Sequence, residues 1–140
     1  MKRLIIIRGI PGSGKSTLAK KMMKNFLSEG LSVGHWENDM FFYDANGNYN
    51  WEGKKVPIAV NWCFNKVKND LIDKDIVIVS NTFIINKHIQ PYIDLAKEFN
   101  ADVSIYRCAN DFGNIHNVPS ETLENMKANM EDCEYEVIVN

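Results

Sequence analysis

The chain has 140 residues and a formal net charge of −2, and 45% of its residues are hydrophobic. That length suits one domain, so we expect residues 1–140 to form a single unit, and the acidic balance argues against tight binding of duplex nucleic acid. The three cysteines and three histidines form no metal-binding pattern, and no apolar run is long enough for a membrane span. We therefore expect a cytoplasmic protein, for which a nucleotide or a nucleic-acid strand end remains a feasible partner.

Apolar runs typical of buried strands alternate with amphipathic helical stripes along the chain. Strands are predicted over residues 3–8, 31–36, 76–79, 103–107 and 136–139. Helices are predicted over residues 15–27, 57–72, 86–99 and 119–130, with a loop over 109–118. Pro91 should kink the third helix or delay its start. The alternation predicts an α/β fold with a parallel sheet, helices on both faces, and ligands at the carboxyl ends of the strands.

The first strand leads into Gly9-Ile10-Pro11-Gly12-Ser13-Gly14-Lys15-Ser16, which matches the phosphate-loop pattern G-x-x-x-x-G-K-[ST] in full. Glycines in such a loop let main-chain N–H groups surround a phosphate at the N-terminus of the next helix. We therefore predict that ATP binds Gly12, Ser13, Gly14, Lys15, Ser16 and Thr17. Lys15 should reach the β- and γ-phosphates as a catalytic residue, and the Ser16 hydroxyl should bind Mg²⁺. ATP is favoured over GTP because the chain lacks a guanine-reading N-K-x-D pattern.

Polar side chains also follow the other strands, and they should gather at the same edge of the sheet. Asp39 is suited to take a proton from an acceptor hydroxyl, although an aspartate that caps a turn is an equal alternative. Glu37 is a weaker candidate for this role and is expected on the opposite side of the chain. Ser80-Asn81-Thr82 follows the third strand, where an acid usually helps to hold Mg²⁺. These uncharged residues can orient a water or a phosphate, and a polar turn between strand and helix is an equal alternative. Arg107 ends the fourth strand and is predicted to contact the nucleotide.

Five aromatic residues surround a predicted tight turn at Asn46-Gly47. They are Phe41, Phe42, Tyr43, Tyr49 and Trp51. Beside a phosphate site, such rings can stack on the bases of an acceptor strand. The alternative, which we favour, is a small core that covers the next helix.

Four stretches resemble small P-loop kinases of the polynucleotide 5′-kinase type, including short, often phage-encoded "AAA family ATPase" proteins and zeta-toxin-like ATPases. The stretches are 4–17, 38–42, 77–82 with Pro91-Tyr92, and 114–126, which contains Asn114-Ile115-His116-Asn117-Val118-Pro119. The resemblance implies a five-stranded parallel sheet in the order 2-3-1-4-5 with a short lid. It also implies transfer of the γ-phosphate of ATP to a hydroxyl, typically the 5′-OH of a nucleic acid, with Asp39 as general base.

Three departures from the family pattern leave the activity open. The stretch 108–118 contains no Arg or Lys, and Gly113 stands where the family often has a lid arginine. Phe42 replaces an arginine that commonly follows the base, and no acid ends the third strand. Arg107 or Arg8 of this chain, or a residue from another subunit, is a candidate to replace the missing arginines. Three functions therefore remain: a kinase on a nucleic-acid end, an ATP-binding or ATPase regulatory protein with little kinase activity, and a small-molecule kinase.

Overall fold

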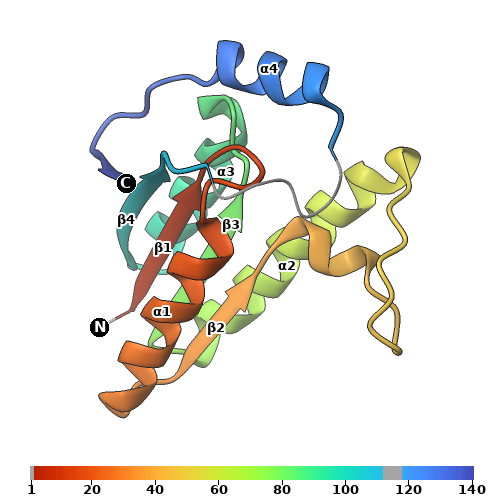
Figure 1. Ribbon diagram of the computed structural model, residues 1–140. Coiled ribbons are helices and arrows are strands. Elements are labelled where there is room, and N and C mark those ends of the chain that lie inside the picture. Colours follow the sequence, from red (N-terminus) through yellow and green to blue (C-terminus); the bar gives the residue numbers. More distant parts are fainter. Residues whose placement is uncertain (1, 112–117) are drawn as a thin grey trace.

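The structure is a computed structural model that describes residues 2–111 and 118–140. Its centre is a five-stranded sheet in the order β2-β3-β1-β4-β5, in which every neighbouring pair is parallel (Figure 1). The strands are β1 (Arg3–Arg8), β2 (Val33–Trp36), β3 (Ile76–Asn81), β4 (Asp102–Cys108) and β5 (Glu136–Val139). The fold class and strand order implied by the sequence are therefore confirmed.

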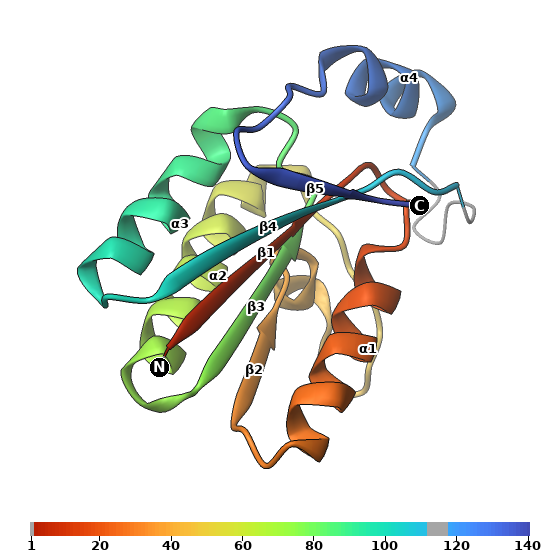
Figure 2. The same ribbon diagram turned by 90° about the vertical axis from the view of Figure 1, so that its left-hand side faces the viewer.

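Helices cover both faces of this sheet. They are α1 (Lys15–Ser28), α2 (Val56–Asp73), α3 (Asn86–Glu98) and α4 (Ser120–Asn129), and two short 3₁₀ helices are η1 (Asn38–Phe42) and η2 (Gly53–Lys55). Figure 2 shows α1 on one face and α2 with α3 on the other. No helix in the described ranges is both long and apolar enough to cross a membrane.

Strand β1 lies at the centre of the core because both of its faces are apolar. Leu4 and Ile6 pack in the cluster that contains the buried side chains of α2 and α3. Ile5 and Ile7 pack in the cluster with α1 on the other face. Since burial of one such side chain contributes about 1.5–3 kcal/mol, this strand is a firm support for the loop that follows it.

Two details differ from the sequence-based prediction. Strand β3 continues to Asn81, so Ser80 and Asn81 belong to the strand rather than to a turn after it. Helix α3 begins at Asn86 and runs through Pro91, so the expected delay of its start is wrong. The lost N–H of Pro91 is tolerated because the apolar face of α3 is buried, including Ile89 and Leu95.

The C-terminal arm, which we define as residues 118–140, packs differently from the rest of the chain. Helix α4 contains no buried residue, and β5 is an edge strand that pairs with β4. In Figure 1, α4 lies above the carboxyl ends of the central strands. Main-chain and side-chain hydrogen bonds tie the segment between α4 and β5 to the start of α3: Glu131 N donates to Ile84 O at 2.9 Å, and Asn86 N donates to Glu131 Oε1 at 2.6 Å.

Candidate phosphate-binding site

The loop between β1 and α1 has the backbone that its glycines were predicted to allow. Gly12 and Gly14 have φ angles of 82° and 100°, which side-chain-bearing residues rarely adopt. A Cβ on Gly9 would collide with the Ser13 hydroxyl and would lie 2.9 Å from Cys108 O. Each of these positions therefore needs glycine for the chain to turn tightly from the buried strand into α1.

The loop presents a half-buried cation at Lys15 and a buried hydroxyl at Ser13. Lys15 Nζ donates to Ile10 O at 3.0 Å, so the side chain lies over the loop. Burial lowers the pKa of Lys15, whereas the carboxylates of Glu37 and Asp39 and the Cys108 thiol oppose that change. Ser13 Oγ is buried and has no hydrogen-bond partner within the described residues. The N-terminus of α1 adds a positive dipole end, so this loop is suited to an anionic phosphate.

The Ser16 hydroxyl is held by the Glu37 carboxylate. Ser16 Oγ donates to Glu37 Oε1 at 2.8 Å, and Ser80 Oγ donates to the same oxygen at 2.9 Å. His35 Nε2 lies 2.8 Å from Ser80 Oγ and 3.3 Å from Glu37 Oε1. A serine hydroxyl next to a carboxylate is a set of hard oxygen donors that fits Mg²⁺ beside a phosphate.

Glu37 stays ionised in this setting. Burial raises the pKa of Glu37, but hydrogen bonds from His35, Ser16 and Ser80 outweigh it and hold the pKa below its ordinary value. The site therefore combines a negative charge at Glu37 with a positive charge at Lys15, both largely withdrawn from water.

Asp39 lies in η1, within electrostatic range of Lys15. Its charge opposes the lowering of the pKa of Lys15, and Tyr49 Oη donates to Asp39 Oδ1 at 3.3 Å. Glu37 contacts Ser16, whereas the hydrogen bond of Asp39 goes to Tyr49, so the expectation that the two carboxylates lie on opposite sides of the chain stays a prediction.

The end of β3 acts as a support for the neighbouring segments. Asn81 Oδ1 accepts a hydrogen bond from Asn38 N at 2.7 Å, which fixes the start of η1. Gly9 N donates to Thr82 O at 3.2 Å, which ties the phosphate loop to the residue after β3. Ser80, Asn81 and Thr82 therefore position the Glu37 carboxylate, the start of η1 and the phosphate loop without adding a charge of their own.

Two arginines at this edge of the sheet are engaged by the C-terminal arm. Arg8 is fully buried, and its guanidinium donates to Phe83 O at 2.7 Å and to Glu136 Oε1 at 2.8 Å. Arg107 pairs with Asp132 at 2.8 Å and with Glu136 at 3.4 Å. To contact a nucleotide, the Arg107 guanidinium would have to leave these carboxylates, so its nucleotide-binding role stays a prediction.

The aromatic segment divides into a packed part and an exposed part. Phe42 is buried, and Phe41 makes edge-on contacts with Phe42 and with Trp62 of α2. This part is the small core that we favoured from the sequence. By contrast, Tyr43 is 46% exposed and Trp51 is 58% exposed, so their rings are open to solvent.

A small hollow lies between the phosphate loop and α4. It encloses about 140 Å³ and is lined by Ile10, Pro11, Asp111, Ser120, Leu123, Glu124 and Lys127. Lys127 is therefore a cationic side chain close to the loop, and it pairs with Glu124 at 3.8 Å. The expected lid, including Gly113 and the string that begins at Asn114, falls largely on residues 112–117, which lie outside the described part of the chain.

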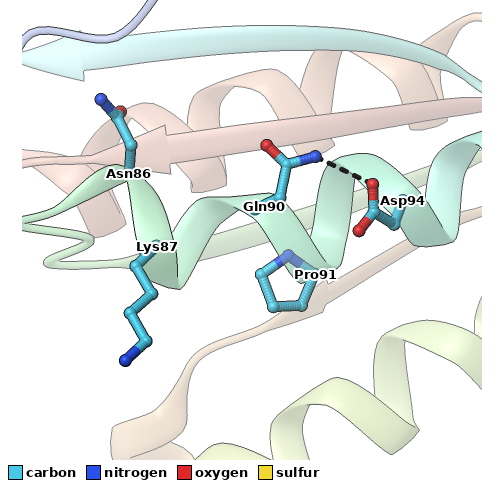
Figure 3. Close-up of a pocket in the computed structure, with 5 residues that line it drawn as sticks. All are labelled: Asn86, Lys87, Gln90, Pro91 and Asp94. Atoms are coloured by element: carbon cyan, nitrogen blue, oxygen red, sulfur yellow. Dashed lines mark hydrogen bonds between the residues drawn. The ribbon is translucent and has the colours of Figure 1, made fainter.

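A second hollow, of about 500 Å³, is lined by residues of α3 alone (Figure 3). The residues are Asn86, Lys87, Gln90, Pro91 and Asp94. Gln90 Nε2 donates to Asp94 Oδ1 at 2.8 Å, and Figure 3 shows Lys87 extending away from the helix. Because no residue of the phosphate loop or of η1 lines it, this hollow is separate from the candidate site.

Known sequences related to the chain match most of its length. The family model described as "AAA domain" matches residues 4–133. An uncharacterized protein of Pasteurella multocida, PM0531, is 31% identical over 140 residues, which covers 90% of this chain and 75% of that protein. NEDD4-binding protein 2 of Homo sapiens is 33% identical over 97 residues, which covers 68% of this chain but only 5% of that protein.

Solved structures with the same fold include nucleotide-binding proteins and kinases. Kti12 of Chaetomium thermophilum, solved with ADP-AlF3, has a TM-score of 0.72 and 17% identity, covering 97% of this chain and 88% of that one. A chain of the Pnkp1/Rnl/Hen1 complex has a TM-score of 0.63 and 22% identity, covering 89% of this chain and 38% of that one. A gluconokinase from Sinorhizobium meliloti 1021 has a TM-score of 0.63 and 14% identity, covering 98% and 81%. At these identities the likeness extends to the fold, which is that of P-loop kinases.

Proposed function

We propose that this chain, which belongs to the AAA domain family and has a kinase-like P-loop domain, transfers the γ-phosphate of ATP to a hydroxyl group. The observation that carries the proposal is that Lys15 and Asp39, supplied by the segments after two separate strands, lie within electrostatic range of each other, because the Asp39 carboxylate opposes the lowering of the pKa of Lys15 by burial. Nucleotide binding alone needs the ammonium group, whereas phosphoryl transfer to a hydroxyl also needs a base.

Each group has a role in the proposed transfer. The loop amides and Lys15 bind the β- and γ-phosphates, and the Ser16 hydroxyl holds the magnesium ion. Bound Mg²⁺ supplies positive charge that neutralises the phosphate oxygens. Asp39 accepts the proton of the acceptor hydroxyl as its oxygen forms a bond to the γ-phosphorus. The bond between that phosphorus and the β-γ bridging oxygen breaks, and ADP leaves with the bridging oxygen.

The acceptor that we favour is a nucleic-acid 5′-OH or a nucleotide-like hydroxyl. Tyr43 and Trp51 are exposed on the segment that follows Asp39, where their rings are available to stack on a base. One structural neighbour, Pnkp1, comes from an RNA repair complex. Other neighbours, such as the gluconokinase, act on small molecules, so a small-molecule acceptor is the alternative within the kinase class.

The test is transfer of label from γ-labelled ATP to oligonucleotides that carry a 5′-OH. We expect Asp39→Asn to lower the rate about 10²–10⁴-fold while ATP affinity stays close to wild type, because the base is lost and the loop is not. Asp73→Asn, at the exposed end of α2, is the matched control and should transfer normally. Transfer at an equal rate by Asp39→Asn would refute the role of Asp39. If oligonucleotides accept no phosphate, a panel of nucleosides and sugars tests the small-molecule alternative.

A second candidate, an ATP-binding regulatory protein with little kinase activity, is favoured by the state of the arginines. All three arginines of the chain lie in the described ranges, and each is engaged. Arg8 and Arg107 pair with the C-terminal arm, and the Arg3 guanidinium lies 5.5 Å from the centre of the Phe26 ring. ATP binding with hydrolysis and transfer no faster than in Lys15→Ala would support this candidate over the kinase.

A further inference from the structure

We propose that Glu37 is the acidic partner of the magnesium site at Ser16, and that it reaches this site from β2 in place of an acid at the end of β3. The inference rests on the proposed function, since it concerns the cation that accompanies ATP. In P-loop proteins an acidic side chain at the end of a neighbouring strand usually helps to hold the Mg²⁺ ion. Here the end of β3 carries Ser80 instead of an acid.

The order of the strands explains how a residue after β2 reaches the phosphate loop. Strand β3 lies between β2 and β1, and Trp36 pairs with Val79, so Glu37 comes level with Ser80. Ser80 in turn pairs with Ile7, at the end of the strand that enters the loop. The short Ser80 side chain leaves room for the longer Glu37 side chain to cross β3 and meet Ser16.

The alternation along the strands puts the participating side chains on the α1 face. Ile78 packs with α1, and Ser80 is two residues later, so it faces the same way. His35 is paired with Ile78, and it contacts both Ser80 and Glu37. Ser16 belongs to the first turn of α1 on this face.

The hydrogen-bond directions prepare Ser16 for a cation. The Ser16 hydroxyl donates its proton to Glu37, which turns the lone pairs of Ser16 Oγ away from the carboxylate. His35 Nε2 lies within hydrogen-bond distance of Ser80 Oγ and 3.3 Å from Glu37 Oε1, so it joins the polar groups gathered at this carboxylate. Glu37 Oε2 has no hydrogen bond within the described residues, so it is available to a water molecule of the cation.

A purely structural role for Glu37 makes a different prediction from a role at the metal. If Glu37 only ordered Ser16 and Ser80, its loss would weaken nucleotide binding equally with and without Mg²⁺. A carboxylate at the metal site repels a bare triphosphate but attracts the metal, so its loss should have opposite effects in the two conditions. This difference in sign is the property to measure.

The experiment compares nucleotide binding to the full chain by calorimetry, with ADP and with a non-hydrolysable ATP analogue, in Mg²⁺ and in EDTA. Glu37→Gln keeps the size of the side chain and removes the charge. We expect it to bind at least as tightly as wild type in EDTA and to lose about 10–100-fold of the affinity gained from Mg²⁺. Glu29→Gln, an exposed residue just after α1, is the matched control and should keep the full gain.

A second variant tests the same assignment in case Glu37→Gln does not fold. Glu37→Ser combined with Ser80→Asp returns the acid to β3 and should restore a gain from Mg²⁺ that Glu37→Gln lacks. Electron paramagnetic resonance with Mn²⁺ and ADP gives a direct readout of the bound cation in each folded variant. Loss of the bound Mn²⁺ signal in Glu37→Gln and its return in the double variant would support the assignment.

The outcomes separate this inference from the proposed function. An undiminished gain from Mg²⁺ in folded Glu37→Gln, or a folded double variant without any gain, would overturn the role of Glu37 and leave phosphoryl transfer untouched. Absence of transfer from a wild-type protein whose Mg²⁺ gain depends on Glu37 would overturn the kinase proposal alone. A wild-type chain that binds no nucleotide would refute both.

Discussion

The phosphate loop and the C-terminal arm meet at the same edge of the sheet, but different forces hold them there. The loop follows β1, whose four central side chains, from Leu4 to Ile7, are almost completely buried. The arm contributes no buried residue from α4, and its strand β5 is exposed at Val137 and Ile138. The arm is attached instead by the β4–β5 pairing, by hydrogen bonds near Ile84, and by ion pairs of two arginines.

The contrast indicates which property a polar substitution should change in each region. Apolar burial spreads the stability of β1 over many contacts, so polar groups of the loop can be specialised for binding. In the arm a few polar contacts carry the attachment, and the most buried of them is the pair of Arg8 and Glu136. We therefore expect polar substitutions to impair ligand binding in the loop and attachment in the arm.

The largest effect is expected for Lys15→Ala. It should reduce phosphoryl transfer at least about 10²–10³-fold, since it removes a charged donor aimed at the phosphates, and it should weaken ATP binding in calorimetry. The unfolding midpoint in urea should not fall, because burial lowers the pKa of Lys15 and so disfavours its charged form in the folded chain. A lysine pKa that is lower in the folded chain than in the unfolded chain means that the fold disfavours the charged form. By linkage, removing this charge therefore does not lower the free energy of unfolding.

Lys20→Ala, at an exposed position of α1, is the control for this variant. It should leave transfer, ATP binding and the urea midpoint unchanged. A large loss of stability in Lys15→Ala would show that polar contacts stabilise the loop as well as the arm. The loop and the arm would then not differ in the forces that hold them.

The next effect is expected for Arg8→Met. It leaves Glu136 buried without its main partner, and loss of one member of a buried ion pair costs about 3–5 kcal/mol. Urea unfolding should report this loss, and hydrogen exchange should speed up most at the amides of β5. The double variant Arg8→Met with Glu136→Gln should recover part of the stability, since no unpaired charge remains.

Arg3→Met is the matched control, because it makes the same replacement at the other end of β1. The Arg3 guanidinium lies over the Phe26 ring, a contact worth about 0.5–1 kcal/mol. Equal losses from Arg3→Met and Arg8→Met would contradict the idea that the buried pair attaches the arm.

The parts of the site that could be predicted from the sequence are those formed by neighbouring residues. The strand, the glycine turn and the helix that begins at Lys15 follow one another in the chain, so their pattern shows directly in the letters. Asp39 could be named as a candidate because it follows a strand, although its role as a base remains a proposal. Each of these inferences needs only local periodicity and the rule for parallel sheets.

Contacts between distant segments could not be predicted in this way. Glu37 contacts Ser16 and Ser80 only after three strands have paired. Arg8 and Glu136 are separated by 128 residues, so their pairing gave no sequence signal. One signal for Glu37 was present, since an acid was missing after β3 while an additional one stood after β2.

The smallest effect is expected for Arg107→Met, which tests the exposed part of the same ion-pair group. Asp132 is 96% exposed at its side chain, and Glu136 keeps its pair with Arg8, so the stability change should stay within about 1 kcal/mol. Calorimetry on the same variant tests the predicted contact with nucleotide: weaker ATP binding would support it, and unchanged binding would refute it. A loss of stability as large as that of Arg8→Met would show that exposed and buried ion pairs contribute equally to the attachment of the arm.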